Sequence, residues 1–414
     1  MDRKICWTER PPGHQPTWRA CSIATAAFPR RTARAYSCPA LTHGTGKTTW
    51  LRQKLPDALF VNLLRSDVYL PLGANPAHLR ALIPEGYSGW IIIDEVQRVP
   101  ELLNEVHDLI EAKGHVFILT GSSARKLRHD SVNLLAGGAL TYHMHPLTAS
   151  EQREEFRLEN SLLYGHLPAR FSEPDPARYL RDYVQTYLRE EVMQEGLTRN
   201  IGHFSHFLEV ASFSQASVLN VSDVARDAHI ARPVAENYFS ILEDLLIGVR
   251  LPVFSRRAKR QLVTHGKFFY FDAGVFRVIR PTGPLDSAAE IDGPALETLV
   301  LQELRATNDY RALDYEIHFW RTKHGLEVDF VLYGPRGLIA IEVKRSTHVK
   351  PADLRALKEF KKDYPEADCV RLYGGEQPLT LGEFRVIPIR EALRSLDRLL
   401  SPTSDEATPL SSPT

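Results

Sequence analysis

The sequence lacks the features that would place it at once in a membrane or nucleic-acid-binding class. No run of 18 apolar residues occurs, so no membrane span is expected. Neither sign of charge is in excess, because lysine plus arginine and aspartate plus glutamate number 51 each. A global attraction to nucleic acid or to a membrane surface is therefore excluded, and any basic surface must be local. No internal repeat is apparent.

Cysteine is scarce, and its spacing matches no metal-ligand pattern. The four cysteines are Cys6, Cys21, Cys38 and Cys369. They indicate a reducing compartment rather than a disulfide framework, so we expect a cytoplasmic protein. The remaining composition, 43% hydrophobic and 25% charged, is that of ordinary globular chains. The length accommodates roughly two to four domains.

Acidic residues are nearly absent from the first 40 positions, which hold two acids but seven lysines and arginines. An arginine-rich, acid-poor leader is compatible with a transit peptide. An unstructured extension or a wrongly assigned start accounts for the same pattern. We assign residues 1–40 to an N-terminal extension that is disordered or mis-assigned. The stretch "ARAYSCPAL" (33–41) has weak strand character, so the first strand of the next domain is expected to be missing or poorly formed.

A phosphate-binding motif follows, without its first glycine. The stretch "ALTHGTGKTTW" (40–50) ends in Gly46-Lys47-Thr48, the end of the pattern G-x-x-x-x-G-K-[ST]. Leu41 stands where that pattern has a glycine. The glycines let backbone N–H groups cradle phosphates, and the helix that follows adds its N-terminal dipole.

Each residue of this motif has an expected role. Lys47 would reach the β- and γ-phosphates of ATP, and Thr48 would hold Mg²⁺. The full nucleotide-binding set on this loop is Gly44, Gly46, Lys47, Thr48 and Thr49.

A continuous apolar run ends in two acids in "WIIIDEVQRVP" (90–100). Such a run is typical of a strand buried on both faces of a parallel sheet. Asp94 would hold Mg²⁺ through water, and Glu95 would orient and polarise the attacking water. The alternative is a strand followed by a capped helix, with both acids solvated.

A third strand, "HVFILTGSS" (115–123), ends in small polar residues. Ser122 or Ser123 would contact the γ-phosphate or its water, although a serine at a strand end is also a common helix cap. A fourth strand is expected within 139–148. Strands that alternate with helical segments predict a P-loop NTPase fold over residues 41–150: a doubly wound α/β domain with ligands at the carboxyl ends of the strands.

The motifs "GTGKTTWLRQ", "IIIDEVQRVPELL", "FILTGSSARKL" and "LLAGG" come in this order. In this the chain resembles the bacterial and archaeal AAA-type ATPases that carry a C-terminal domain of unknown function, over roughly residues 41–395. The resemblance implies ATP and Mg²⁺ as cofactors. Two departures are Leu41 and Gly138, since the family usually has an arginine after "LAG". Arg125 and Arg128 are weak substitutes for that arginine.

Residues 151–204 predict a helical lid or linker, and residues 205–280 predict a winged-helix-like domain. Two helices are expected around a tight turn, the first capped by Ser222 and the second starting at Ala231. Duplex DNA would be bound through Arg226, His229 and Arg232. The second helix also carries Glu236, Glu243 and Asp244, which leaves little affinity from counterion release. We therefore favour a protein-contact or architectural role.

The stretch 325–346 predicts a β-hairpin with "GPRG" (334–337) as its turn. In this register Asp329 lies opposite Glu342. One face is apolar and buried, with Leu326, Val328, Phe330, Leu332, Ile339, Ile341 and Val343. The other face holds Glu327, Asp329, Glu342 and Lys344. Opposed carboxylates repel each other, and a divalent cation between them would remove that repulsion.

This arrangement, with Glu297 on a preceding helix, resembles the PD-(D/E)xK core of restriction-endonuclease-like domains, here residues 281–395. The resemblance implies that Asp329 and Glu342 bind a second Mg²⁺, that Lys344 stabilises phosphate charge, and that Glu297 supports the metal or water. The alternative is a solvated polar face with paired charges. Such a fold also serves for binding alone.

Together these patterns predict an AAA-type ATPase that uses Mg·ATP to drive or switch action on DNA or a protein partner. A homo-oligomer is compatible with the sequence, and no membrane partner is expected. The alternatives are an ATP-gated, metal-dependent nuclease and a non-catalytic regulator with a degenerate P-loop. The tail, residues 396–414, is rich in serine, threonine and proline and is expected to be disordered.

Overall fold

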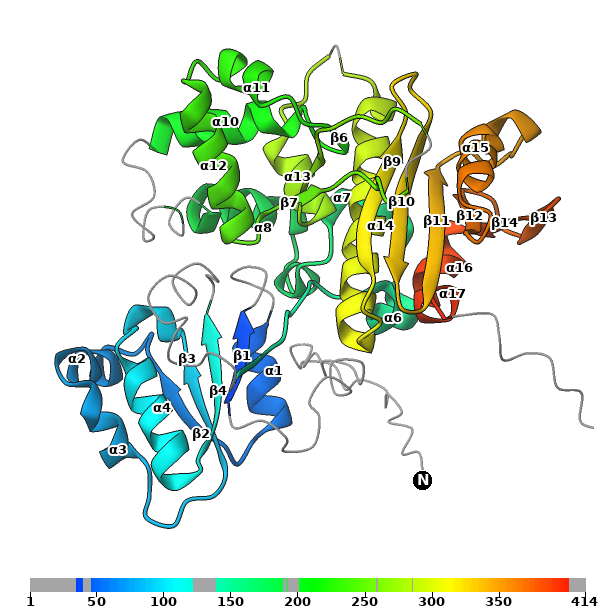
Figure 1. Cartoon of the computed structure of the whole chain (residues 1–414). Helices are drawn as coiled ribbons and strands as arrows, with labels where there is room; N and C mark the ends of the chain where they lie inside the picture. The colour runs from blue at the N-terminus through cyan, green and yellow to red at the C-terminus, as the bar shows by residue number, and fades with distance from the viewer. Residues whose placement is uncertain are drawn as a thin grey trace, which may run out of the picture.

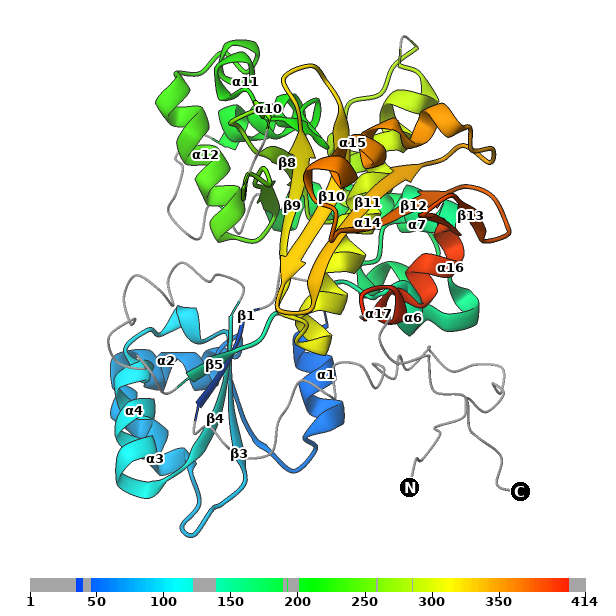
Figure 2. The ribbon, with the colours of Figure 1, turned by 45° about the vertical axis from the view of Figure 1, so that its right-hand side comes forward.

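The computed structural model describes residues 35–39, 46–121, 139–188, 192, 201–257, 260–284 and 286–401. The N-terminal sheet and its helices lie apart from the two other sheets, which are close together in both views (Figure 1, Figure 2). None of the helices within the described residues is both long and apolar enough to cross a membrane.

The N-terminal sheet is parallel throughout, in the order β2-β3-β4-β1-β5. Its strands are β1 (Ala35–Pro39), β2 (Leu59–Asn62), β3 (Trp90–Asp94), β4 (Val116–Gly121) and β5 (Ala139–Thr141). Its helices are α1 (Lys47–Lys54), α2 (Ser66–Ala74), α3 (Leu79–Leu82) and α4 (Leu102–Lys113), with short 3₁₀ turns η2 (Pro76–His78) and η3 (Val96–Arg98).

Both faces of this sheet are buried, as the apolar run 90–94 predicts. Ile91 and Ile93 pack in one core cluster with Val106 of α4. Ile92 packs on the other side with Leu51 of α1. The parallel, helix-covered sheet confirms the α/β prediction for this part of the chain.

The strand before the phosphate loop is present, contrary to our expectation. β1 pairs in parallel with both β4 and β5, so it lies inside the sheet. Residues 35–39 therefore belong to the sheet rather than to an N-terminal extension that runs to residue 40. The local pattern was weak because β1 has only five residues, and the pairing that places it involves residues about 80 and 100 positions away.

The middle region begins with short helices and continues as three helices against a small sheet. The short elements are α6 (Ala149–Gln152), η4 (Arg153–Glu155), α7 (Leu158–Tyr164), η5 (Pro168–Phe171), α8 (Pro176–Asp182) and the π-helical η6 (Tyr183–Leu188). There follow α10 (Ile201–Ser212), β6 (Ser217–Val218), α11 (Val221–Asp227), α12 (Arg232–Asp244), β7 (Gly248–Leu251), β8 (Lys267–Tyr270) and α13 (Ala273–Ile279). The antiparallel sheet has the order β6-β8-β7. Asn220 caps α11, because its side chain accepts a hydrogen bond from the N–H of Ser222; the expectation that Ser222 is the cap was wrong.

The C-terminal region is a mixed six-stranded sheet in the order β13-β14-β12-β11-β10-β9. Its elements are α14 (Ala288–Arg311), β9 (Glu316–Arg321), β10 (Glu327–Gly334), β11 (Gly337–Lys344), η7 (Pro351–Leu354), α15 (Arg355–Asp363), β12 (Asp368–Tyr373), β13 (Leu379–Leu381), β14 (Phe384–Pro388), α16 (Ile389–Arg394) and α17 (Leu396–Leu399). Strands β9, β10 and β11 are antiparallel, and β12 runs parallel to β11.

The hairpin of β10 and β11 has the predicted register. Gly334 pairs with Gly337 across a two-residue turn, and the ladder continues to Phe330 opposite Ile341. One further pair would bring Asp329 opposite Glu342. Gly337 has φ of 128°, which a side chain would disfavour, so glycine suits the end of this turn.

The prediction that all seven apolar residues of the hairpin share one face was wrong. Five of the seven predicted residues do share a core cluster on the α14 side, namely Phe330, Leu332, Ile339, Ile341 and Val343. Leu326 and Val328 pack on the opposite side with Val331, because the pairing of β10 with β9 shifts at a bulge between Val328 and Val331. That second side is also buried, since Leu357 and Phe360 of α15 cover it.

Candidate functional site

The end of the phosphate loop lies at the carboxyl edge of the N-terminal sheet. Gly46 precedes α1 with φ of 80° and ψ of 18°, a left-handed conformation that favours glycine. The last residues of β1 and β4, Pro39 and Gly121, pair with each other at the same edge. Asp94 ends β3 beside them. The motif residues and the acid are therefore brought together by the parallel sheet, as expected.

Thr48 and Asp94 are in direct contact. The Thr48 hydroxyl donates to Oδ2 of Asp94 at 2.8 Å, although 46 residues separate them. The other carboxylate oxygen of Asp94 accepts from the Thr120 hydroxyl, and the side chain is fully buried. Thr120 also accepts a hydrogen bond from the backbone N–H of Glu95 at 3.3 Å. Thr120 thus fixes both acids. The sequence analysis missed it, although it stands in the polar end of the strand predicted over 115–123.

Glu95 and Lys47 form a loose pair beside this contact. Glu95 is 4% exposed and has φ of 62°, a strained conformation for a residue with a side chain. One of its carboxylate oxygens lies 3.7 Å from Nζ of Lys47, and the other accepts from Gln97 at 2.5 Å. Nζ of Lys47 is buried and has no hydrogen-bond partner among the residues that the structure describes. A buried ammonium without an acceptor is costly, so this group is suited to receive one.

Of the remaining residues expected in this site, one is described by the structure and the others are not. Thr49 is exposed in the first turn of α1. Gly44 and Ser122 lie outside the described residues, as do Leu41, Gly138, Arg125 and Arg128.

A second charged cluster lies in the C-terminal region, around an amine that the sequence analysis did not consider. Carboxylate oxygens of Glu297, Glu327 and Asp329 lie within 4.8 Å of one another. Nζ of Lys267 lies 3.1 Å from Oε2 of Glu297 and 3.9 Å from Oδ1 of Asp329, and it also contacts Glu327. The Lys267 side chain is fully buried. Lys344 lies at the edge, with Nζ 3.6 Å from Oδ2 of Asp329.

Glu342 is held apart from this trio, although the predicted site paired it with Asp329. Its Oε1 lies 3.3 Å from Arg371 of β12, which is the next strand in the sheet. Oδ2 of Asp329 instead accepts the N–H of Val343 at 2.8 Å. Burial, and secondarily the charge of Asp329, raises the pKa of Glu342 to about 7. The residues that gather with Asp329 are therefore Glu297, as expected, and Glu327, which was placed on the same face but given no metal role.

The sequence pattern around Lys267 and Arg371 indicates buried cations, but the sequence analysis did not use it. Lys267 begins the apolar stretch "KFFYF", and Arg371 interrupts "CVRLY". A lone cation in a buried strand requires an acid nearby. The acids that pair with Lys267 are 30 residues away or more, and those that pair with Arg371 are 18 and 29 residues away, so they could not be named from local pattern.

Three sequence families match consecutive stretches of the chain. An AAA domain matches residues 42–152, a domain of unknown function (DUF8612) matches residues 155–286, and another domain of unknown function (DUF4143) matches residues 292–392. The chain carries an AAA-type P-loop domain in its N-terminal part and a domain of unknown function (DUF4143) at its C-terminal end.

Two curated relatives are the uncharacterized proteins Rv2008c of Mycobacterium tuberculosis and Mb2031c of Mycobacterium bovis. Each is 26% identical over 372 residues, which cover 86% of this chain and 81% of the relative. Among solved structures, the chain is similar to the Aeropyrum pernix ORC1 protein in complex with DNA, with 13% identity, a TM-score of 0.25, and coverage of 62% of this chain and 88% of that chain. Protein VC1899 from Vibrio cholerae has 13% identity and a TM-score of 0.22, over 83% of this chain and 97% of that chain.

The AAA domain meets the next region at the phosphate loop itself. A Cβ on Gly46 would lie 3.8 Å from Cγ of Pro168, so η5 packs beside the loop. Two residues on, Arg170 is buried and donates from Nε to the carbonyl of Gly165 at 2.9 Å. Burial lowers the pKa of Arg170 to about 10. Gly46, which ends the phosphate loop, therefore lies near a residue outside the AAA domain.

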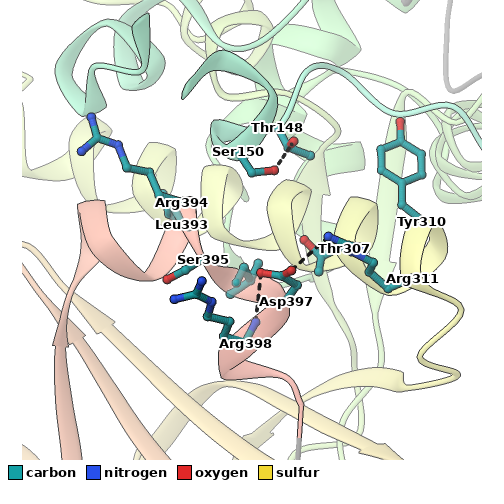
Figure 3. A pocket seen from close by; sticks show the side chains of 11 residues that line it. Thr148, Ser150, Thr307, Tyr310, Arg311, Leu393, Arg394, Ser395, Asp397 and Arg398 are labelled. Atoms are coloured by element: carbon teal, nitrogen blue, oxygen red, sulfur yellow. Dashed lines mark hydrogen bonds and ion pairs between the residues drawn. The ribbon is translucent and has the colours of Figure 1, made fainter. Parts of the chain in front are cut away.

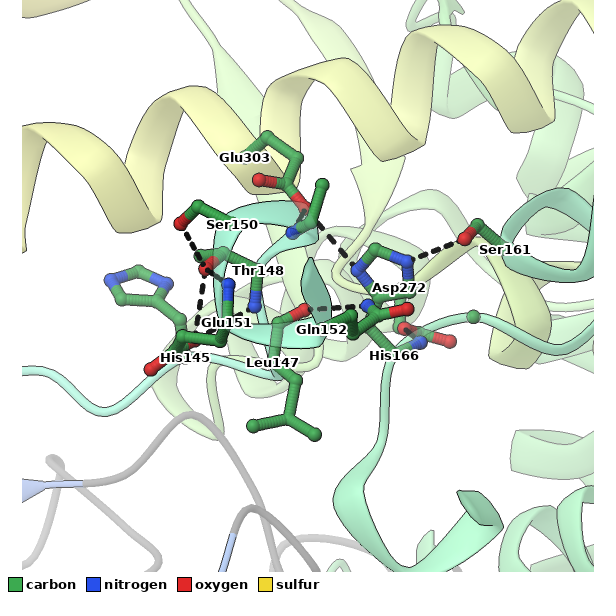
Figure 4. Close-up of polar contacts among 12 residues, drawn as sticks. His145, Leu147, Thr148, Ser150, Glu151, Gln152, Ser161, His166, Asp272 and Glu303 are labelled. Carbon is green, nitrogen blue, oxygen red and sulfur yellow. Dashed lines mark hydrogen bonds and ion pairs between the residues drawn. The ribbon is translucent and has the colours of Figure 1, made fainter. Parts of the chain in front are cut away.

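A buried polar network joins the end of the AAA domain to the long helix α14 (Figure 4). Oε1 of Glu303 accepts the N–H of Ala149 at 2.7 Å and lies 3.2 Å from Nδ1 of His166. Nε2 of His166 lies 2.8 Å from the Ser161 hydroxyl. Burial lowers the pKa of His166 to about 3 and raises the pKa of Glu303 well above its usual value. The imidazole of His166 is therefore neutral at neutral pH.

A surface pocket of about 340 Å³ lies beside this junction, between α6, α14 and the two last helices (Figure 3). Among its three arginines, Arg311 is paired with Asp397 at 3.0 Å, and the backbone N–H of Arg398 donates to the same carboxylate at 3.0 Å. We assign no ligand to it. The lining residues are Thr148, Ser150, Thr307, Tyr310, Arg311, Leu393, Arg394, Ser395, Leu396, Asp397 and Arg398.

The cations expected to bind DNA in the middle region are engaged with acids of their own helices. Arg226 pairs with Asp223 at 3.0 Å and with Asp227 at 2.9 Å. Arg232 pairs with Glu236 at 3.0 Å. His229 lies in the turn and its ring stacks on another histidine ring at 6.2 Å.

Proposed function

We propose that the AAA domain binds and hydrolyses Mg·ATP. The observation that carries the proposal is the buried amine of Lys47, which lacks a hydrogen-bond acceptor beside the Thr48–Asp94 contact. Phosphate oxygens are the acceptors that a lysine in this position takes. The N-terminus of α1 adds unpaired N–H groups and a positive dipole end at the same point.

Each site residue has a role in this proposal. Backbone N–H groups of Gly44, Gly46 and Thr49 cradle the phosphates, and Lys47 binds the β- and γ-phosphates. Thr48 and Asp94 hold Mg²⁺, which neutralises phosphate charge when it is bound. Glu95 orients the attacking water in line with the γ-phosphate, and Ser122 contacts that phosphate. Leu41 adds a side chain where the usual motif has none, which weakens binding without removing the contacts of Lys47 and Thr48.

The hydrolysis cycle is proposed to act on a protein partner rather than on DNA. The order of elements from α10 to β8 supports a winged-helix-like fold in the middle region, but Arg226 and Arg232 are already paired with acids. Phosphate contacts would have to displace those acids, which lowers DNA affinity. The proximity of Pro168 to Gly46 and the hydrogen bond between Ala149 and Glu303 give the nucleotide site a route to the other regions.

The order of the C-terminal elements, one helix, three antiparallel strands, one helix and a parallel strand, supports a restriction-endonuclease-like fold. We do not extend the proposal to nuclease chemistry. Asp329 and Glu342 have separate partners, and the acid trio contains a lysine.

Calorimetry with Mg·ATP on the full chain and on Lys47→Ala tests the proposal. We expect the wild type to bind and the variant to lose about 100-fold in affinity or more, since charge-assisted hydrogen bonds to phosphate disappear. Lys113→Ala, which removes an exposed lysine at the end of α4, is the matched control and should bind as the wild type does. Equal affinity in all three proteins would overturn the proposal and favour a regulator with a degenerate P-loop.

A further inference from the structure

The amine of Lys267 takes a central position among acids from two other elements. Lys267 begins β8 of the middle region, whereas Glu297 comes from α14, and Glu327 and Asp329 come from β10. All three carboxylates lie within 4 Å of the amine. The side chain is fully buried, so its charge is not shared with solvent. The ring of Phe319 lies on another side of the amine, at 5.6 Å.

The cations around the trio balance its charge. Besides Lys267, Arg321 lies 3.0 Å from Oε2 of Glu327, and Lys344 lies 3.6 Å from Asp329. Three carboxylates thus face three cations. Burial and the charge of Asp329 raise the pKa of Glu297, so its protonation would leave the cluster net positive. In neither state does the cluster carry the negative charge that attracts a divalent ion.

We propose that the Lys267 ammonium occupies the place of a divalent cation among Glu297, Glu327 and Asp329, and that it closes this cluster to Mg²⁺ and Mn²⁺. The trio offers oxygen ligands of the kind that Mg²⁺ prefers, at mutual distances that a metal could bridge. The ammonium of Lys267 already occupies the position that such a metal would take. The C-terminal carboxylates therefore hold two regions together and do not form a metal-dependent nuclease centre.

The lysine is fixed in this place by its backbone. Lys267 pairs with Leu251 of β7, and its neighbours Phe268 and Phe269 are fully buried. One core cluster runs from these rings through α14 to the hairpin of β10 and β11. Lys267 cannot leave the acids without a disruption of that core. Burial disfavours its ammonium form, but the carboxylates outweigh this effect and raise the pKa of Lys267 above its usual value.

Manganese binding to the nucleotide-free full chain, followed by electron paramagnetic resonance of free Mn²⁺, tests the proposal. Lys267→Met keeps the length of the side chain and removes its charge. We expect this variant to gain one Mn²⁺ site, about 100-fold tighter or more than any wild-type binding at the trio, because the buried unit charge that fills the position is removed. Adding Asp329→Asn to Lys267→Met should abolish the gained site. Lys344→Met, which leaves Lys267 in place, should gain none.

A second comparison does not depend on whether Lys267→Met folds. The wild type and Glu327→Gln should take up Mn²⁺ equally, because the trio holds no metal in either protein. Wild-type Mn²⁺ binding that Glu327→Gln removes would overturn the proposal. A Lys267→Met variant with a native circular dichroism spectrum and no new Mn²⁺ site would overturn it as well.

Discussion

The molecule places two buried lysines beside acids, and the two amines differ in what they have left to bind. Lys47 in the AAA domain lies 3.7 Å from one carboxylate oxygen and has no hydrogen-bond partner within the described parts of the chain. Lys267 is bonded to Glu297 at 3.1 Å and surrounded by two further carboxylates. Both are buried, so desolvation is similar in kind.

This difference in hydrogen bonding distinguishes the Lys47 site, which can still bind a ligand, from the Lys267 site, where the amine is already bonded within the protein. An amine kept from water without an acceptor destabilises the empty protein, and a bound phosphate would reverse that cost. An amine among carboxylates is satisfied without a ligand and stabilises the fold. The residue types are the same in both places. A ligand is therefore expected where the lysine amine lacks hydrogen-bond acceptors. The presence of lysine and acids alone does not indicate a ligand site.

The largest effect that follows from this comparison concerns Glu95. Glu95→Gln should retain ATP binding and lower the rate of hydrolysis by about 10²–10⁴, the usual loss when a general base is removed. Phosphate release measures the rate, and calorimetry measures binding. Glu101→Gln, an exposed change a few residues further along, should leave both unchanged. A Glu95→Gln protein that hydrolyses ATP at the wild-type rate would show that this buried acid has no part in the reaction.

The next effect concerns stability in the absence of any nucleotide. Lys267→Met leaves the buried Asp329 and the half-buried Glu297 and Glu327 without their central cation, so we expect unfolding free energy to fall by about 3–5 kcal/mol. Lys47→Met removes a buried amine whose one ionic contact within the described residues is 3.7 Å long, so the unfolding free energy should stay the same or rise, by about 1 kcal/mol at most. Urea unfolding followed by tryptophan fluorescence and circular dichroism measures both. Equal losses in the two variants would break the comparison.

The smallest effect is a pH dependence that arises in the C-terminal region. The pKa of Glu342 is raised to about 7 in the folded protein, so between its unfolded value and pH 7 the folded state binds more protons than the unfolded state. Its contribution to stability is therefore present below about pH 4.5 and is lost as the pH rises to about 7, by about 3 kcal/mol at most.

Glu342→Gln removes this titration, so we expect a flatter fall in stability across that range. Urea midpoints at several pH values would measure the change. Part of the fall should remain, because the pKa of Glu297 is also raised. A profile for Glu342→Gln that superimposes on the wild-type profile would contradict this account.

Sequence pattern was sufficient where the signal is local. The run of isoleucines before Asp94 predicts a strand buried on both faces, and the acids at its end meet the phosphate loop because parallel strands share a carboxyl edge. The turn at 334–337 fixed the register of the hairpin. A five-residue strand such as β1, without an apolar run, could not be recognised without its neighbours in the sheet.

The C-terminal site was predicted less well, for two physical reasons. A bulge in β10 breaks the alternation of faces, so Val328 packs opposite to its expected side, and no residue in the local sequence marks that break. The charge partners also come from elsewhere in the chain: Lys267 lies 60 residues before Glu327, and Arg371 comes from the next strand of the sheet. Charge balance in a core depends on tertiary packing, which a local motif does not contain.

The hydrogen bond from Ala149 to Glu303 has a consequence for synthesis on the ribosome. Its two partners are 154 residues apart, so at roughly 5–20 residues per second the Ala149 amide is made about 8–30 seconds before its acceptor. Until α14 emerges, the Ala149 amide has no Glu303 carboxylate to bond, and the first turn of α6 lacks this hydrogen bond. The AAA domain is therefore synthesised well before the residue that accepts the hydrogen bond at its C-terminal end.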